Sequence, residues 1–244
     1  MNSRVIVKRE ADKKPKPQPS KVSLFHANVL NSATLNLNRD EIRVLLLCKK
    51  KITQLGAWPE DDLFRFTRQE YSTEYGVGED EAGRDLKKAI NGFRGKYITL
   101  REQMDGVWME GEIDWTTSRW RCDQRGVYAI KLNSDLKPYL MPNSYEKLFT
   151  ITQFEEARRL NTKWSQLLYD MLCQFQETGM CVARIDDIRI RWATPKSYDK
   201  WSLFKTRIIE PSVDELRKIA RFSTLTWEVK HREGNAPSVI MFQF

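Results

Sequence analysis

Histidine and cysteine are scarce in this chain of 244 residues. It has two histidines, His26 and His231, and four cysteines with no Cys-x-x-Cys spacing. A structural zinc site needs four such ligands at close spacing, so the sequence argues against zinc. Cys48 and Cys173 each lie inside an apolar helical run, which favours buried free thiols in a reducing cytosol.

Long apolar runs are also missing. No stretch has the length of a signal-peptide core or of a membrane span, and we therefore expect a soluble, cytoplasmic protein that does not contact a membrane. Apolar residues make up 41% of the chain, which is enough for a packed core. The length suggests one large domain or two small ones, and two are favoured.

Charge is distributed unevenly along the chain. The formal net charge is +8, and residues 1–21 carry seven basic and two acidic residues, so most of the excess lies in this Lys- and Pro-rich tail. Residues 84–101 hold six basic residues and one acidic residue, whereas residues 60–81 hold eight acidic and two basic. Such segregation is typical of an element that faces DNA beside one that faces solvent. The tail itself is predicted to be flexible.

The most informative segment is residues 197–211, which combines basic residues with apolar residues at helical spacing. Its apolar members fall on one stripe, while the polar ones point elsewhere. The apolar stripe consists of Trp201, Phe204, Ile208 and Ile209. Residues 185–192 read as a short helix, and residues 193–196 read as a turn. The order of helix, turn and basic helix predicts a helix-turn-helix.

The elements around this motif sharpen the prediction. Residues 225–230 and 238–242 alternate as strands around the polar turn 232–235, which is typical of a wing. Upstream, residues 163–176 form an amphipathic scaffold helix. Three helices followed by a hairpin define a winged-helix domain.

The same order of elements is predicted a second time, in the first half of the chain. A helix starts at Asn38, a short strand covers residues 64–67, and helices cover residues 68–75 and 80–92. Strands follow at residues 97–100, 107–115 and 127–132. We therefore predict an α+β protein with two tandem winged helices, divided into a flexible basic tail (1–21), an N-terminal domain (22–145) and a C-terminal domain (146–244).

With two winged helices predicted, the chain resembles the Rep-type replication initiator proteins of iteron-containing bacterial plasmids. The matching passages lie in the same order along the chain, at residues 35–41 (LNLNRDE), 128–140 (YAIKLNSDLKPYL), 149–150 (FT), 168–172 (LYDML) and 204–216 (FKTRIIEPSVDEL). The resemblance covers about residues 25–244. It implies binding to directly repeated origin DNA as a monomer, and repression of the protein's own promoter by a homodimer on an inverted repeat. It also implies the host replication initiator and the replicative helicase as partners.

The resemblance places the sequence-reading contacts on the second helix-turn-helix, and the expected DNA-binding residues there are Ser197, Tyr198, Lys200, Lys205, Thr206 and Arg207. Relatives often carry three basic residues where this chain has Lys205, Thr206 and Arg207. At Pro211 the local pattern allows a helix restart with a capping box, whereas the resemblance favours a tolerated kink.

A second basic face is predicted on the helix over residues 80–92, opposite its apolar residues. Its expected DNA-binding residues are Arg84, Lys87, Lys88 and Arg94. Residues 119–125 mix Arg119, Trp120, Arg121 and Arg125 in what reads as a long loop, and this mixture suits a phosphate backbone or a dimer interface equally well. Trp164, Trp192 and Trp227 lie on apolar faces and are expected in the core.

Two catalytic chemistries are disfavoured. Initiators that nick DNA use a tyrosine beside a metal held by paired histidines, and the two histidines here are isolated. The Gly95-Lys96 dipeptide is followed by Tyr97 and has Ile90 where a phosphate-binding loop needs its first glycine. We therefore expect a protein that is not an enzyme, with no cofactor and no metal. The alternatives are a winged-helix transcriptional repressor without initiator activity and a structural partner protein whose basic faces are incidental.

Overall fold

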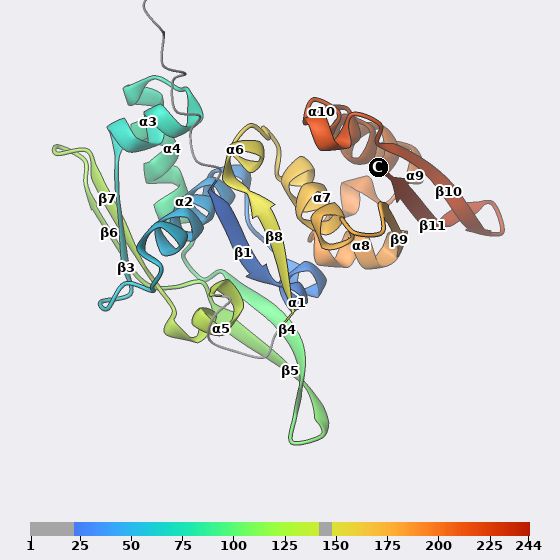
Figure 1. Ribbon diagram of the computed structural model, residues 1–244, viewed down its shortest axis with the longest axis horizontal. Helices are drawn as coiled ribbons and strands as arrows, with labels where there is room; N and C mark the ends of the chain where they lie inside the picture. The colour runs from blue at the N-terminus through green and yellow to red at the C-terminus, as the bar shows by residue number, and fades with distance from the viewer. Residues whose placement is uncertain (1–21, 142–147) are drawn as a thin grey trace, which may run out of the picture.

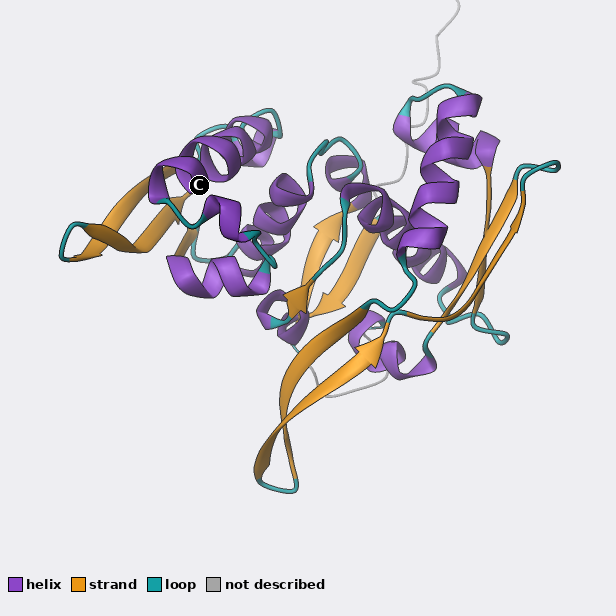
Figure 2. Ribbon diagram, turned by 180° about the vertical axis from the view of Figure 1, so that it is seen from behind, coloured by secondary structure: helices purple, strands orange, loops and turns teal. Residues whose placement is uncertain are grey.

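The computed structural model describes residues 22–141 and 148–244. The tail (1–21) and the domain boundary predicted near Tyr145 lie outside the described residues. Two similar units lie side by side, each made of helices and a small antiparallel sheet (Figure 1). Their wings project from opposite outer sides of the molecule (Figures 1 and 2).

The first winged helix follows the predicted order of elements. They are α2 (Arg39–Leu55), β3 (Leu63–Thr67), α3 (Arg68–Tyr75), α4 (Glu79–Gly92), β6 (Thr116–Cys122) and β7 (Val127–Leu132). The strand order is β3-β7-β6, so the last strand lies between the first strand and the outer strand of the wing.

The second winged helix repeats this topology. Its elements are α7 (Lys163–Gln174), β9 (Met180–Arg184), α8 (Ile185–Arg191), α9 (Trp201–Phe204), α10 (Glu210–Leu216), β10 (Thr226–Glu233) and β11 (Ala236–Gln243). A π-helical segment, Lys205–Ile209, joins α9 to α10. The strand order β9-β11-β10 corresponds to β3-β7-β6. The prediction of two winged helices in an α+β fold is confirmed.

The start of α2 shows how the sequence places these helices. The Asn38 side chain accepts hydrogen bonds from the backbone N–H groups of Asp40 and Glu41, and the Glu41 carboxylate accepts one from the Asn38 N–H. This reciprocal capping box satisfies donors that a helix start otherwise leaves unpaired. Gly56 ends the helix in the left-handed conformation, at φ 63°, which glycine adopts without strain.

A long hairpin is inserted into the first winged helix. It consists of β4 (Tyr97–Met104) and β5 (Val107–Asp114), with β2 (Thr34–Leu35) on the other edge of β4. Asp105 and Gly106 both have positive φ, as a two-residue Asp-Gly hairpin turn requires. The hairpin extends away from the rest of the molecule (Figure 2).

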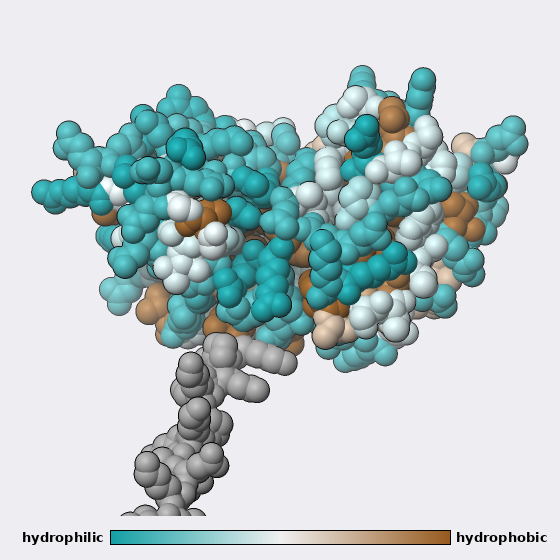
Figure 3. Space-filling view, turned by 90° about the horizontal axis from the view of Figure 1, so that it is seen from above, coloured by the Kyte–Doolittle hydropathy of each residue, from teal (hydrophilic) through white to brown (hydrophobic). Residues whose placement is uncertain are grey.

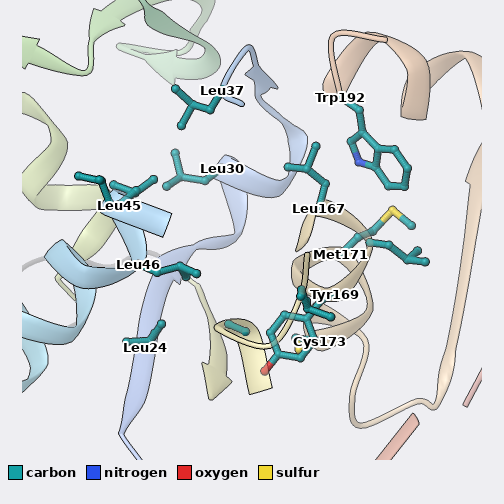
Figure 4. Close-up of a cluster of buried hydrophobic side chains, with 14 of the residues drawn as sticks. Leu24, Leu30, Leu37, Leu45, Leu46, Leu167, Tyr169, Met171, Cys173 and Trp192 are labelled. Carbon is teal, nitrogen blue, oxygen red and sulfur yellow. The ribbon is translucent and has the colours of Figure 1, made fainter. Parts of the chain in front are cut away.

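The two winged helices share a hydrophobic core. β1 (Ser23–Ala27) pairs with β8 (Phe149–Gln153), which brings together segments more than a hundred residues apart. Short helices surround this pair: α1 (Asn28–Ser32), α5 (Lys137–Leu140) and α6 (Phe154–Ala157). Figure 4 shows side chains of the first winged helix and its neighbouring segments, among them Leu24 and Leu45, packing in one cluster with Leu167 and Met171 of α7.

The structure corrects two predictions and confirms a third. Residues 119–122 are not part of a long loop, because β6 continues through Cys122 and pairs with β7. Trp192 is buried as expected, but Trp164 and Trp227 are only half-buried. Cys48 and Cys173 are buried free thiols, and burial raises the pKa of the Cys173 thiol to about 12.

Among the described residues, no helix has the length and apolar character needed to cross a membrane.

Candidate nucleic-acid interface

The helix that runs from Trp201 through the π-helical segment to Leu216 is the centre of the candidate interface. Phe204, Ile208 and Ile209 are fully buried beneath it. The chain continues through Pro211 without a break, although proline cannot donate the usual backbone hydrogen bond. The wider π-helical turn directly precedes the proline, and π-bulges and prolines are both known sites of irregular helix geometry. The structure therefore shows a proline that the helix tolerates rather than a helix restart with a capping box, because the Ser212 hydroxyl donates to the backbone oxygen of Ile208.

The opposite face of this helix is exposed and rich in hydrogen-bonding groups. Lys200, Ser202, Thr206 and Arg207 are all exposed there. The Thr206 hydroxyl donates a 2.8 Å hydrogen bond to the backbone oxygen of Ser202. Its lone pairs remain available, so Thr206 presents an acceptor on this face, whereas Lys200 and Arg207 present donors.

The remaining predicted residues of the second winged helix lie at the edge of this face. Ser197 is exposed, and the half-buried Tyr198 packs edge-on against Trp164 with 6.5 Å between ring centroids. Lys205 turns toward the wing, where its ammonium lies 5.7 Å from the Trp227 ring and 3.5 Å from the Glu210 carboxylate. Lys205 is therefore less free to reach DNA than Lys200 or Arg207.

A residue missed by the sequence reasoning holds the helix-turn-helix together. The Arg189 guanidinium of α8 donates a 2.7 Å hydrogen bond to the backbone oxygen of Asp199, just before α9. It also lies 4.9 Å from the centre of the Phe204 ring. Arg189 thus joins the first helix of the motif to the start of the second. The sequence separation of Arg189 and Phe204 does not predict this contact, because the fold of the turn between the two helices brings the side chains together.

The predicted basic face of the first winged helix lies on α4. Ala82, Leu86, Ala89 and Ile90 are buried on its inner side. The outer side carries three of the predicted residues, Arg84, Lys87 and Lys88, and the fourth, Arg94, lies two residues beyond the end of the helix; all four are exposed. The structure therefore brings the predicted residues together as two groups, one on each winged helix. In the view of Figure 3 the surface is mainly hydrophilic, with small apolar patches.

Two of the α4 lysines are paired with carboxylates. The Lys87 ammonium lies 3.0 Å from Asp123 at the tip of the β6–β7 wing, and the Lys88 ammonium lies 3.1 Å from the buried Asp40. The hydrogen bond from Lys87 lowers the pKa of Asp123. The wing also reaches α4 through Arg121, whose guanidinium donates a 2.6 Å hydrogen bond to the Asn91 side chain. Trp120 on the same strand is 63% exposed.

We expect Asp123→Asn to strengthen DNA binding roughly two- to fivefold at moderate salt. The substitution removes the charge that neutralises Lys87 and so makes one more cation available to a phosphate. The slope of log affinity against log salt concentration should then become steeper by about one. Fluorescence anisotropy over a salt series measures both effects. Asp61→Asn, which removes a carboxylate paired with Arg65 before β3, is the matched control. Equal behaviour of the two variants would show that Lys87 does not contact DNA.

The fold and the two exposed basic helices define a tandem winged-helix DNA-binding protein. The family model described as "Initiator Replication protein, WH1" matches residues 23–173, and the one described as "Initiator Rep protein, WH2" matches residues 184–244. The chain therefore belongs to the Rep family of plasmid replication initiators, which are DNA-binding replication proteins.

Two relatives are similar to the chain over most of its length. The crystal structure of the Pi initiator protein in complex with iteron DNA has a TM-score of 0.74 and 19% sequence identity, covering 93% of this chain and 98% of that one. This similarity supports the fold. An uncharacterized 27.6 kDa protein of Escherichia coli is 22% identical over 213 residues, 81% of this chain and 86% of that protein.

Proposed function

We propose that this initiator binds directly repeated origin sequences, or iterons, as a monomer through both winged helices. The observation that carries the proposal is the repetition of the fold: each unit has a helix with a buried apolar face and an exposed basic face. The structural similarity to a Pi initiator protein that was crystallised on iteron DNA supports the same assignment.

We propose that the two winged helices have different roles in DNA binding. The second winged helix reads bases through Lys200, Thr206 and Arg207, with Ser197, Tyr198 and Lys205 at the edge of the contact. The first winged helix holds the phosphate backbone through Arg84, Lys87, Lys88 and Arg94. Lysine and arginine supply most of the phosphate contacts in such complexes, whereas sequence is read at base edges in the major groove.

DNase footprinting on the origin of the protein's own plasmid tests this function. We expect protected segments that recur with the period of the direct repeats, and an affinity that falls steeply with salt because several phosphates are neutralised. Protection confined to a single inverted repeat would instead identify a transcriptional repressor without initiator activity.

Arg207→Ala is expected to weaken binding to the cognate repeat by about 1–3 kcal/mol and to relax base preference at one position, if the guanidinium reads a base edge. Binding to unrelated DNA should change much less. Competition titrations with repeats mutated at each position measure the preference. An unchanged cognate affinity in a folded variant would remove Arg207 from the interface.

We further propose a homodimer that forms through the first winged helix and represses the protein's own promoter. The β4–β5 hairpin supports this proposal, because Met104, Val107, Trp108 and Met109 are each more than half exposed near its tip. Exposed apolar side chains grouped in this way mark interaction surfaces. A two-fold dimer suits an inverted-repeat operator, whereas a monomer suits a direct repeat.

Origin opening, in this proposal, uses binding energy and DNA bending rather than catalysis, and the complex then recruits the host initiator and the replicative helicase. The family resemblance supports this step. Co-sedimentation of each purified host protein with the initiator on origin DNA tests it, with the same DNA lacking the repeats as the control.

A further inference from the structure

One apolar side chain interrupts the exposed face of the second winged helix. Leu203 is 40% exposed on α9. It lies between Lys200, one turn earlier, and Arg207, one turn later, so the three side chains form one stripe. The core beneath the helix is filled by Phe204, Ile208 and Ile209. Leu203 thus points away from the side of the helix that packs against the protein.

We propose that Leu203 reads the 5-methyl group of a thymine in the target sequence. This inference rests on the proposed function, because it assumes that α9 enters the major groove. The thymine methyl is the apolar group that base pairs present there, and it distinguishes thymine from the other three bases. An apolar side chain has no hydrogen bond to offer a polar base edge, whereas contact with a methyl group buries apolar surface on both partners.

The neighbours of Leu203 favour this ligand. Lys200 and Arg207 offer donors to the acceptors of guanine or to phosphate oxygens, and Thr206 offers lone pairs because its hydroxyl hydrogen is bonded to the backbone of Ser202. Leu203 lies near the N-terminal end of the helix, the end that usually approaches base edges in helix-turn-helix proteins. The arrangement therefore recognises a thymine flanked by hydrogen-bonding bases or phosphates.

A test combines the full-length protein with DNA in which single thymines of the repeat are replaced by deoxyuridine, which lacks only the methyl group. For the wild-type protein we expect one thymine position at which this replacement weakens binding about three- to tenfold, the size expected for one buried methyl group. In Leu203→Ala, replacement at that position should have no further effect. Such non-additivity identifies a direct contact.

Two further variants make the result decisive. Leu203→Met keeps an apolar side chain of similar volume and should retain the sensitivity to the methyl group. Leu55→Ala changes an equally apolar side chain that is 64% exposed at the end of α2, and it should behave as the wild-type protein does. Because Leu203 lies outside the core, the thermal unfolding of Leu203→Ala should match that of the wild type.

The outcomes separate this inference from the function on which it rests. Two results would overturn the role of Leu203 and leave iteron binding intact. In the first, the losses in affinity from Leu203→Ala and from deoxyuridine add at every position. In the second, the wild-type protein binds equally well when any single thymine methyl group is removed. A wild-type protein that does not distinguish the repeat from unrelated DNA would overturn the proposed function and the inference together.

Discussion

Lys49→Met is expected to lower the free energy of unfolding by about 3 kcal/mol, the low end of the range for leaving a buried charge without its compensating charge. Lys49 of α2 is 6% exposed, and it lines a cavity of about 40 Å³ together with Asp170 of α7. Burial raises the pKa of Asp170, and Lys49 opposes that rise. Removing the ammonium would leave the carboxylate without its compensating charge. Urea denaturation at pH 7 measures the loss.

The same lysine anchors a chain of hydrogen bonds that joins the two winged helices. Its ammonium has donors alone, so His26 Nδ1, at 3.2 Å, must accept, and His26 Nε2–H then donates to Asn31 at 2.9 Å. Burial lowers the pKa of His26, in agreement with a neutral ring. The Asn31 amide continues to Thr150 of β8 and to Gln174 of α7. Lys49→Met should therefore loosen the contact between the units as well.

The double variant Lys49→Met/Asp170→Asn is the critical control, because it removes both charges and should recover most of the loss. Lys51→Met, on the same helix, breaks a partly exposed pair with Glu70 and should cost about 1 kcal/mol or less. The hypothesis that Lys49 compensates the charge of Asp170 would be contradicted by either of two results. One is an equal loss of unfolding free energy in Lys49→Met and Lys51→Met, and the other is a double variant as unstable as Lys49→Met.

The loss of unfolding free energy in Lys49→Met should also depend on pH. A carboxyl group whose pKa is raised in the folded state stabilises the protein below its unfolded pKa of about 4, and this contribution is lost as the pH rises through the folded pKa. Without Lys49 the folded pKa of Asp170 rises further. The difference between the variant and the wild type should therefore be small near pH 4 and reach its full size toward neutral pH.

Much of the fold could be predicted because its helices carry their own signals. The capping residues at Asn38 and the apolar stripe from Trp201 to Ile209 are local patterns, and local patterns set where helices start and which face is buried. The β1–β8 pair has no such signal, since its strands are more than a hundred residues apart. The sequence predicts a loop over residues 119–125, where β6 ends, because most side chains of this strand face solvent and its apolar residues do not alternate.

The candidate site was predictable in outline for the same reason. Helical spacing separates the exposed face from the buried one, which identifies Lys200 and Arg207. It cannot show that Lys205 turns to Trp227 or that Lys87 meets Asp123, because tertiary folding brings these partners together. Leu203 did carry a signal: it is an apolar residue off the apolar stripe. This signal indicates a DNA contact only when the helix face that carries Lys200 and Arg207 is known to be exposed.

Trp108→Glu should abolish the proposed dimer at micromolar concentration and leave the monomer folded. Trp108 is 61% exposed on β5, with the Arg101 guanidinium 5.8 Å from its ring centre. Tryptophan is among the residues that most often dominate a protein interface, and losing one costs about 2–4 kcal/mol, or roughly 30- to 1000-fold in the dissociation constant. A charge buried in its place adds a desolvation penalty. Sedimentation equilibrium at matched concentrations measures the change.

Trp120→Glu provides the matched control, because Trp120 is equally exposed but lies on the β6–β7 wing. It should leave self-association unchanged, because the proposed dimer forms through the β4–β5 hairpin, whereas the wing packs beside α4. If the hairpin forms the dimer, Trp108→Glu should also lose affinity for an inverted repeat while its binding to a single direct repeat stays at the wild-type level, because one monomer occupies one direct repeat. A Trp108→Glu protein that still dimerises would place the interface on another surface of the molecule.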